Sequence, residues 1–262
     1  MNTLDQKLFI ILELQVKVSN IDLSEMDTVI LAGGLGTRLR RVVSDRPKVM
    51  AEINGKPFLC YLLDQLAEEN IERVIISTGY MAGKIEEAVG FSYKGMKVDY
   101  SEEETPLGTG GSLKLAGQIV NTKHCLVMNG DSYTEFDLDS LLIKHQKRNT
   151  SVTIIVKVVD NTSCYGTIQM DEKNRITDFT EKGNTSGKGI INTGVYLMKT
   201  SVLYAIPEKI NYSLENDFFP RMVGNGIYGY ETKGKFIDIG TPASYLSANE
   251  FFKKLNVSFD CR

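Results

Sequence analysis

Short strand-like runs alternate with amphipathic segments along the first half of the chain. Most of the runs are apolar and rich in β-branched residues, and they predict buried strands at residues 28–31, 73–77, 98–101 and 124–128. The segments between them predict helices over residues 58–69, 80–89 and 109–116. Because strands that alternate with helices form parallel sheets, this half predicts an α/β fold with helices on both faces of a mainly parallel sheet.

The pattern changes after residue 150. Segments rich in β-branched and apolar residues predict strands at residues 152–159, 166–170, 175–179 and 189–198. Polar turns such as residues 171–174 separate them. No internal repeat or long linker interrupts the chain, so we expect one domain over residues 27–255. Residues 1–26 then form an N-terminal extension of unassigned role, and residues 256–262 form a C-terminal tail.

Composition narrows the class of protein. The 262 residues carry a net charge of −3 and include two histidines and four scattered cysteines. This charge gives no support to nucleic acid or a membrane surface as a partner, and two histidines exclude a histidine-rich metal site. Cys60 and Cys125 stand in apolar surroundings and are expected to be buried reduced thiols, as in a cytoplasmic protein. The apolar run at residues 8–12 is too short to span a bilayer.

A glycine-rich loop directly follows the first predicted strand. It has the sequence AGGLGTRL at residues 32–39, and Lys48 stands further along. Glycines let backbone N–H groups bind phosphate oxygens, and Arg38 and Lys48 add full positive charges. The loop lacks the Gly-Lys-Ser/Thr ending of a Walker motif, and Leu39 stands where a dinucleotide-binding motif needs a third glycine. The pattern favours a triphosphate site of another kind, and a plain glycine-rich turn is the alternative.

Two aspartates stand where a metal ion could bind. Asp131 follows the predicted strand 124–128, at the strand end where α/β sheets bind ligands, although a turn residue is the alternative interpretation. Since the glycine-rich loop also follows a strand end, we expect it to line one cleft with Asp131. Asp238 lies between Ile237 and Ile239, and a carboxylate in an apolar strand needs a partner such as a metal ion.

Several motifs together resemble the sugar-1-phosphate nucleotidyltransferases. The resemblance covers residues 27–255, and its motifs are the loop and Pro-Lys pair at 32–48, KPFL at 56–59, PLGTGG at 106–111, NGD at 129–131, EKG at 181–183, NTG at 192–194 and DIGTP at 238–242. It implies a Rossmann-like three-layer αβα fold, the nucleotide-diphospho-sugar transferase fold, with a mainly parallel mixed central sheet. Residues 106–111, 213–220 and 236–240 are most similar to the D-glycero-α-D-manno-heptose 1-phosphate guanylyltransferases of this family.

The resemblance implies transfer of a nucleoside monophosphate from NTP to a sugar 1-phosphate, with release of pyrophosphate. The attacking phosphate oxygen is already an anion, so the site needs positioning and charge neutralisation rather than a general base. By resemblance, Arg38 binds the leaving phosphates, Lys48 bridges them and the α-phosphate, and Lys182 holds the sugar phosphate. Asp131 and Asp238 resemble the pair that binds the cofactor Mg²⁺. The catalytic residues implied are Arg38, Lys48, Asp131 and Lys182.

The resemblance also divides the binding residues into a nucleotide side and a sugar side. The nucleotide side comprises Leu31, Ala32, Gly33, Gly34, Gly36, Thr37, Arg38, Lys48, Glu103, Gly108, Thr109 and Asp131. The sugar side comprises Asn129, Gly166, Glu181, Lys182, Asn192, Gly194 and Glu215. Without the resemblance, Glu181 and Lys182 would be interpreted as a solvated charge pair. Glu215 and Asp217 fit the acidic start of a helix equally well.

Glu103 is the residue from which we predict the base of the nucleotide substrate. Relatives that transfer uridylyl or thymidylyl groups have a glutamine at the equivalent position. A glutamine amide both donates and accepts hydrogen bonds, whereas an ionised carboxylate only accepts them. Guanine presents its N1–H beside its N2 amino group, so Glu103 favours GTP. The alternative is that residues 102–104 form a solvated acidic run.

The leading expectation is a Mg²⁺-dependent guanylyltransferase that uses GTP and D-glycero-α-D-manno-heptose 1-phosphate to make a nucleotide sugar for surface polysaccharide. The alternatives are a mannose-1-phosphate guanylyltransferase, another hexose-1-phosphate nucleotidyltransferase, or a non-catalytic regulatory subunit that binds a nucleotide sugar. A regulatory subunit would be expected to lose a phosphate-binding cation or a metal carboxylate, and this chain keeps them all. The sequence does not determine the quaternary state, so a homo-oligomer is one option.

Overall fold

The strands and helices follow the predicted alternation and add several short elements. The computed structural model describes residues 21, 23, 26–180 and 186–255. The first half contains β1 (Met26–Leu31), η2 (Lys48–Met50), β2 (Glu52–Ile53), β3 (Lys56–Pro57), α2 (Phe58–Glu68), β4 (Arg73–Thr78), α3 (Ala82–Val89), β5 (Ser92–Tyr93), β6 (Met96–Glu102), α4 (Gly108–Ala116), β7 (His124–Asn129), β8 (Ser132–Thr134) and α5 (Leu138–Lys147). The second half contains β9 (Val152–Val159), β10 (Thr167–Met170), β11 (Ile176–Thr180), β12 (Gly189–Lys199), η3 (Thr200–Ala205), η4 (Leu214–Phe218), α6 (Phe219–Met222), β13 (Ile227–Glu231), β14 (Phe236–Asp238) and α7 (Pro242–Lys254).

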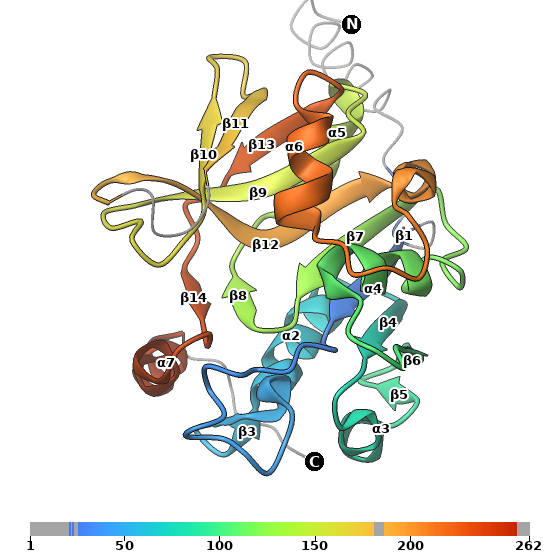
Figure 1. Cartoon of the computed structure of the whole chain (residues 1–262), viewed down its shortest axis with the longest axis vertical. Coiled ribbons are helices and arrows are strands. Elements are labelled where there is room, and N and C mark those ends of the chain that lie inside the picture. Colours follow the sequence, from blue (N-terminus) through green and yellow to red (C-terminus); the bar gives the residue numbers. More distant parts are fainter. Residues whose placement is uncertain (1–20, 22, 24–25, 181–185, 256–262) are drawn as a thin grey trace, which may run out of the picture.

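A mixed sheet forms the centre of the molecule (Figure 1). Its strands follow the order β11-β10-β12-β7-β1-β4-β6-β5, and β9 pairs with both β12 and β13. The neighbours β7, β1, β4 and β6 are parallel, as the alternation of strands and helices predicts. β12 pairs antiparallel with β7, β9 and β10. The expected mixed sheet is confirmed, but parallel pairing dominates only in the first half, because hairpin connections such as that between β10 and β11 produce antiparallel neighbours.

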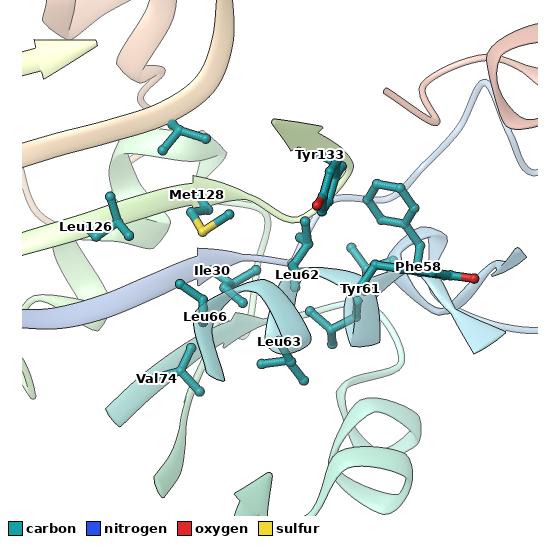
Figure 2. Packing of buried hydrophobic residues seen from close by; sticks show 14 of the residues in the cluster. Ile30, Phe58, Tyr61, Leu62, Leu63, Leu66, Val74, Leu126, Met128 and Tyr133 are labelled. Atoms are coloured by element: carbon teal, nitrogen blue, oxygen red, sulfur yellow. The ribbon is translucent and has the colours of Figure 1, made fainter. Parts of the chain in front are cut away.

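Alternate side chains of the central strands point to opposite faces of the sheet. Ile30 of β1 and Val74 of β4 pack with the apolar side of α2 on one face. Their sequence neighbours Val29 and Ile75 pack with Leu113 of α4 on the other face. Figure 2 shows the first face, where the leucines of α2 lie over β1, β4 and β7. This period of two produces the three layers of helix, sheet and helix that the family resemblance implies.

α5 and α7 are the longest described helices without a counterpart among the predicted elements. α5 begins after Asp137, whose side chain accepts a backbone hydrogen bond of the first turn, and α7 begins after Thr241 with Pro242 in its first turn. The Phe252 ring of α7 stacks on the Tyr61 ring of α2, with 3.9 Å between the centroids. α7 is thereby anchored to α2, and it holds β14, which pairs with β8 just after β7.

The described residues include three free cysteines. Cys125 is buried as expected, Cys60 is only partly buried, and Cys164 is exposed. Burial raises the pKa of the Cys125 thiol to about 12, so this side chain stays protonated. In the part of the chain that the structure describes, no helix is long and apolar enough to cross a membrane.

Candidate active site

The glycine-rich loop lines a cavity of about 230 Å³ at the carboxyl end of β1. The cavity is lined by Leu31, Ala32, Gly34, Gly36, Thr37, Arg38, Lys48, Val49, Asp131 and Gly240. Gly36 has a φ of +58°, and a Cβ at this position would lie 2.9 Å from the Cβ of Lys48. Glycine is therefore required at this turn of the loop. Most residues expected on the nucleotide side meet in this cavity, and Val49 and Gly240 join them.

Arg38 and Lys48 converge on one wall of the cavity. A Cβ on Gly240 would lie 3.8 Å from Arg38 Nη2 and 3.7 Å from Lys48 Nζ. Lys48 Nζ donates a hydrogen bond of 2.5 Å to Asp131 Oδ2. The Lys48 side chain is 11% exposed and the Asp131 side chain is 40% exposed, so the carboxylate has the greater access to solvent. The two cations are placed to neutralise the charge of a bound phosphate group.

Strand pairing brings the two expected metal-binding aspartates together. β8 and β14 are antiparallel, and Ile239 N donates to the carbonyl oxygen of Asp131 at 2.9 Å. Asp238 Oδ1 accepts a hydrogen bond of 2.7 Å from Gly240 N, and Asp238 Oδ2 accepts one of 2.8 Å from the Tyr165 hydroxyl. Burial and the adjacent Asp238 carboxylate raise the pKa of Tyr165, so the phenol keeps its proton and acts as the donor.

These two carboxylates form an oxygen donor set that suits Mg²⁺. This ion binds one or two protein carboxylates and completes its coordination with phosphate oxygens and water. Among the described residues, no group of three His, Cys, Asp or Glu side chains is arranged to hold a metal ion. The donor set therefore fits a magnesium ion that binds together with a phosphate substrate.

Glu103 lies buried close to the glycine-rich loop. It is only 8% exposed, whereas Glu102 and Glu104 are exposed, so the alternative of a solvated acidic run holds for its two neighbours alone. Glu103 Oε2 accepts hydrogen bonds from Leu107 N, at 3.2 Å, and from the Ser112 hydroxyl. The carboxylate is thus held in one orientation by partners on α4 and on the loop before it.

Two glycines make room for this carboxylate. A Cβ on Gly33 would lie 2.6 Å from Glu103 Oε1, and a Cβ on Gly79 would lie 2.9 Å from the same oxygen. Any larger residue at either position would collide with the carboxylate. Gly33, which was expected to bind the nucleotide, is not part of the cavity lining. It leaves space for the Glu103 carboxylate.

The sugar side expected from the NTG motif forms a polar corner on β12. Gly194 has a φ of +82°, and a Cβ there would lie 2.8 Å from both Asn129 Nδ2 and Ser132 Oγ. Asn192 Oδ1 accepts from Gly194 N at 2.8 Å, and Asn192 Nδ2 donates to the Tyr196 hydroxyl at 3.0 Å. Asn129 Oδ1 is buried and has no hydrogen-bond partner among the described residues, so it can accept one from a ligand.

Glu215 contacts residues of both sides. Thr109 Oγ1 donates to Glu215 Oε2 at 2.6 Å, and the Tyr196 hydroxyl donates to Glu215 Oε1 at 3.1 Å. Asp217 Oδ2 accepts from Ser213 N at 2.8 Å. Asp217 therefore stabilises the start of η4, which is the role that the alternative interpretation gives it, while Glu215 points toward the neighbouring elements.

The other expected residues lie elsewhere. Gly108 has a φ of +71° at the start of α4, and a Cβ there would lie 2.8 Å from the carbonyl oxygen of Tyr212, so it packs against this segment and not in the cavity. Gly166 is also absent from the cavity lining and immediately precedes β10. Glu181 and Lys182 lie outside the described residues.

Several residues of the site are not among those expected from the sequence, including Val49, Gly79, Ser112, Tyr165, Tyr196 and Gly240. Val49, Ser112 and Gly240 stand beside or within the recognised motifs, and this adjacency is a signal that could identify them. Tyr165 is next to the expected residue Gly166, and Tyr196 lies two residues after Gly194. Gly79 carries no such signal, because only the folded chain brings it to Glu103.

The fold and the cavity define a phosphate-binding α/β protein whose loop differs from the Walker and dinucleotide types. The chain belongs to the nucleotidyl transferase family, whose model matches residues 27–254. It is 37% identical to the D-glycero-alpha-D-manno-heptose 1-phosphate guanylyltransferase of Aneurinibacillus thermoaerophilus, over 86% of this chain and 97% of that protein. It is 36% identical to the mannose-1-phosphate guanylyltransferase of Mycobacterium tuberculosis, over 85% of this chain and 63% of that protein.

A solved structure shows the same relationship. The crystal structure of HddC from Yersinia pseudotuberculosis complexed with GMP-PN matches this fold with a TM-score of 0.77 and 38% identity, over 86% of this chain and 99% of that one. These similarities confirm the family and the fold that the sequence motifs imply.

Proposed function

We propose that this protein is a guanylyltransferase that transfers GMP from GTP to the phosphate of a sugar 1-phosphate and releases pyrophosphate. One observation carries the proposal: the glycine-rich loop, Arg38, Lys48 and Asp131 line a single cavity. The similarity to a heptose 1-phosphate guanylyltransferase over 97% of that protein supports the same activity. GMP-PN in the HddC complex supports a guanine nucleotide as the ligand of this cavity.

The cavity supplies charge and position rather than acid–base chemistry. In the proposed reaction, an anionic oxygen of the sugar phosphate attacks the α-phosphorus of GTP, and the bond from this phosphorus to the pyrophosphate oxygen breaks. Loop N–H groups and Arg38 bind the departing phosphates, and Lys48 neutralises charge next to the reacting phosphorus. Such fixed charges act most strongly where the negative charge develops, on the leaving pyrophosphate.

Asp131 and Asp238 are proposed to hold Mg²⁺. The ion would neutralise phosphate charge and orient the two reacting groups when it is bound. The side chains themselves support the assignment, because both carboxylates lie beside the two cations of the cavity and Asp238 is fixed by Gly240 N and Tyr165. Lys182, which lies outside the described residues, is proposed from the resemblance to hold the sugar phosphate.

GTP and D-glycero-α-D-manno-heptose 1-phosphate are the proposed substrates. Glu103 supports guanine, since a buried carboxylate fixed by Ser112 and Leu107 accepts from the N1–H and N2 amino groups of that base. Asn192, Gly194 and the buried Asn129 Oδ1 are proposed to face the sugar. Mannose 1-phosphate is the second candidate, because a mannose-1-phosphate guanylyltransferase is 36% identical to this chain.

A pyrophosphate-release assay tests this function. The full chain is incubated with GTP, UTP, dTTP or ATP, each with heptose, mannose or glucose 1-phosphate, with Mg²⁺ or a chelator. We expect release with GTP and a manno-configured sugar 1-phosphate, none after chelation, and none in Asp131→Asn. Asp178→Asn, at an exposed aspartate outside the site, is the matched control and should keep full activity. Binding of a GDP-sugar without release for any pair would instead indicate a regulatory subunit.

A further inference from the structure

A continuous set of hydrogen bonds joins the nucleotide side to the sugar side, with Glu215 at its centre. Glu215 Oε2 accepts from Thr109 Oγ1 at 2.6 Å and from Ser213 Oγ at 3.0 Å. Glu215 Oε1 accepts from the Tyr196 hydroxyl at 3.1 Å. Asn192 Nδ2 donates in turn to the Tyr196 hydroxyl at 3.0 Å. One carboxylate therefore links the start of α4 to β12.

The surroundings hold both partners of Glu215 in place. Tyr196 is completely buried, and its ring packs against Phe219 with 4.8 Å between the centroids. Thr109 Oγ1 accepts a hydrogen bond of 2.9 Å from Leu214 N, which precedes Glu215 in η4. Because each end of the link is fixed by its own packing, the carboxylate sets the spacing between them.

These contacts change the role expected for Glu215. The family resemblance implies that it contacts the sugar, but three protein donors already use its two oxygens. We propose that Glu215 is a positioning residue that fixes the nucleotide side, through Thr109, relative to the sugar side, through Tyr196 and Asn192. This inference rests on the proposed function, because such spacing matters only where two substrates react.

The proposed reaction requires a fixed distance between the two substrates, and this link would maintain that distance. An oxygen of one substrate must lie about 3–3.5 Å from the phosphorus of the other, and a misplacement of about 1 Å can cost about a hundredfold in rate. Thr109 lies in the first turn of α4, whose Ser112 holds Glu103, while Asn192 binds the backbone of Gly194. A charged hydrogen bond to each side is a stiff connection, since bonds to ionised groups are shorter and stronger than neutral ones.

Paired variants of Thr109 provide the test. Thr109→Val removes the hydroxyl and keeps the shape, and Thr109→Ser keeps the hydroxyl. We expect Thr109→Val to raise the KM for the sugar 1-phosphate about tenfold at saturating GTP, which is the effect of one hydrogen bond to a charged group. This rise would occur although Thr109 lies on the nucleotide side. Thr109→Ser should rescue most of this effect, with a rise much smaller than that in Thr109→Val, since its hydroxyl can still donate to Glu215.

Tyr196→Phe should raise the same KM, and the double variant with Thr109→Val should be no worse than either single variant, since both changes act through Glu215. A Thr109→Val protein that alters only the KM for GTP, or a double variant whose effects multiply, would overturn the proposal.

Hydrogen exchange of residues 189–199 gives a readout that does not depend on catalysis. Exchange there should rise in Thr109→Val and not in Thr109→Ser, and unchanged exchange in both would also contradict the link. A wild-type protein that transfers no GMP would refute the proposed function, while the exchange result would still decide the role of Glu215.

Discussion

At the scale of single residues, the two oxygens of Glu103 have different neighbours. Oε2 is occupied by Leu107 N and Ser112, whereas Oε1 lies against Gly33 and Gly79. An ionised carboxylate can only accept hydrogen bonds, so it matches a base edge that presents two neighbouring donors. Guanine has such a pair, its N1–H beside its N2 amino group, while uracil and thymine flank their ring N–H with carbonyl oxygens. Selectivity for the base would then depend on one carboxylate side chain.

Glu103→Gln should therefore erode the preference for GTP. The amide keeps the size of the side chain but offers one donor in place of an acceptor, so we expect the ratio of kcat/KM for GTP to that for UTP to fall about tenfold to a hundredfold. Glu104→Gln is the matched control, because Glu104 is exposed and should leave the ratio unchanged. An unchanged ratio in Glu103→Gln, or a wild type that uses UTP as well as GTP, would contradict the guanine contact.

At the scale of elements, β12 changes register within the sugar side. Its pairing with β9 is regular as far as Asn192, resumes at Tyr196 and is irregular between them. Gly194 lies in this interval with a φ of +82°. Bulges of this kind redirect side chains next to functional sites. The irregularity places the hydrogen bond between Asn192 and Tyr196 near the partly buried Asn129.

Replacing Gly194 by alanine should damage both stability and sugar binding. The new Cβ would lie 2.8 Å from Asn129 Nδ2 and Ser132 Oγ, on a backbone with positive φ. Gly224→Ala is the matched control, because Gly224 has a φ of +80° and no heavy atom within 4 Å of a Cβ. We expect Gly194→Ala to lose about 1–3 kcal/mol more unfolding free energy than Gly224→Ala in urea titrations, and to raise the KM for the sugar 1-phosphate. Equal losses would show that backbone strain alone is responsible.

Local sequence patterns predict the central strands and α2, whereas α5 and α7 are not among the predicted elements. β1, β4, β7 and α2 follow directly from runs of β-branched residues and from leucines at helical spacing. α7 includes Ser, Asn, Tyr and Phe, which are weak helix formers. α5 is short, but it places Leu138, Leu141 and Leu142 at helical spacing, a signal that the predicted elements leave out. The cap residues Asp137 and Thr241 are a further signal that the sequence offers for these helices.

At the scale of the whole molecule, the site combines strand ends of the first half with segments that arrive from the second half (Figure 1). The loop after β1, Glu103 after β6 and Asp131 after β7 could be predicted, because parallel strands place their carboxyl ends along one edge. The position of Asp238 depends on the pairing of β14 with β8, and that of Glu215 on a hydrogen bond to Thr109. Partners about a hundred residues apart leave no local pattern, so the sequence marks Asp238 only as a carboxylate in an apolar strand that needs a partner, and the family resemblance points to Glu215.

The stability of the whole molecule should depend on one buried histidine. His145 of α5 is 1% exposed, and its Nδ1 lies 2.8 Å from the hydroxyls of both Thr150 and Thr153. Its Nε2 is buried without a hydrogen-bond partner in the described part of the chain. Burial, helped by the nearby His124 and Lys199, lowers the pKa of His145 from 6.5 to about 3. The folded protein therefore keeps this ring neutral across the physiological range of pH.

The sign of the pH dependence follows from this shift. Below pH 6.5 the unfolded chain binds a proton at His145 that the folded protein excludes until about pH 3, so stability is complete above pH 6.5 and falls as the pH decreases. We expect a loss of about 2 kcal/mol of unfolding free energy between pH 7 and pH 5 from this residue. His145→Asn removes the titration and leaves a polar group near the Nδ1 position for the two threonines. Urea titrations at both pH values should show a loss about 2 kcal/mol smaller in the variant than in the wild type. Because all carboxylates are shared by the two proteins, equal losses would mean that His145 is already protonated in the folded state at pH 5.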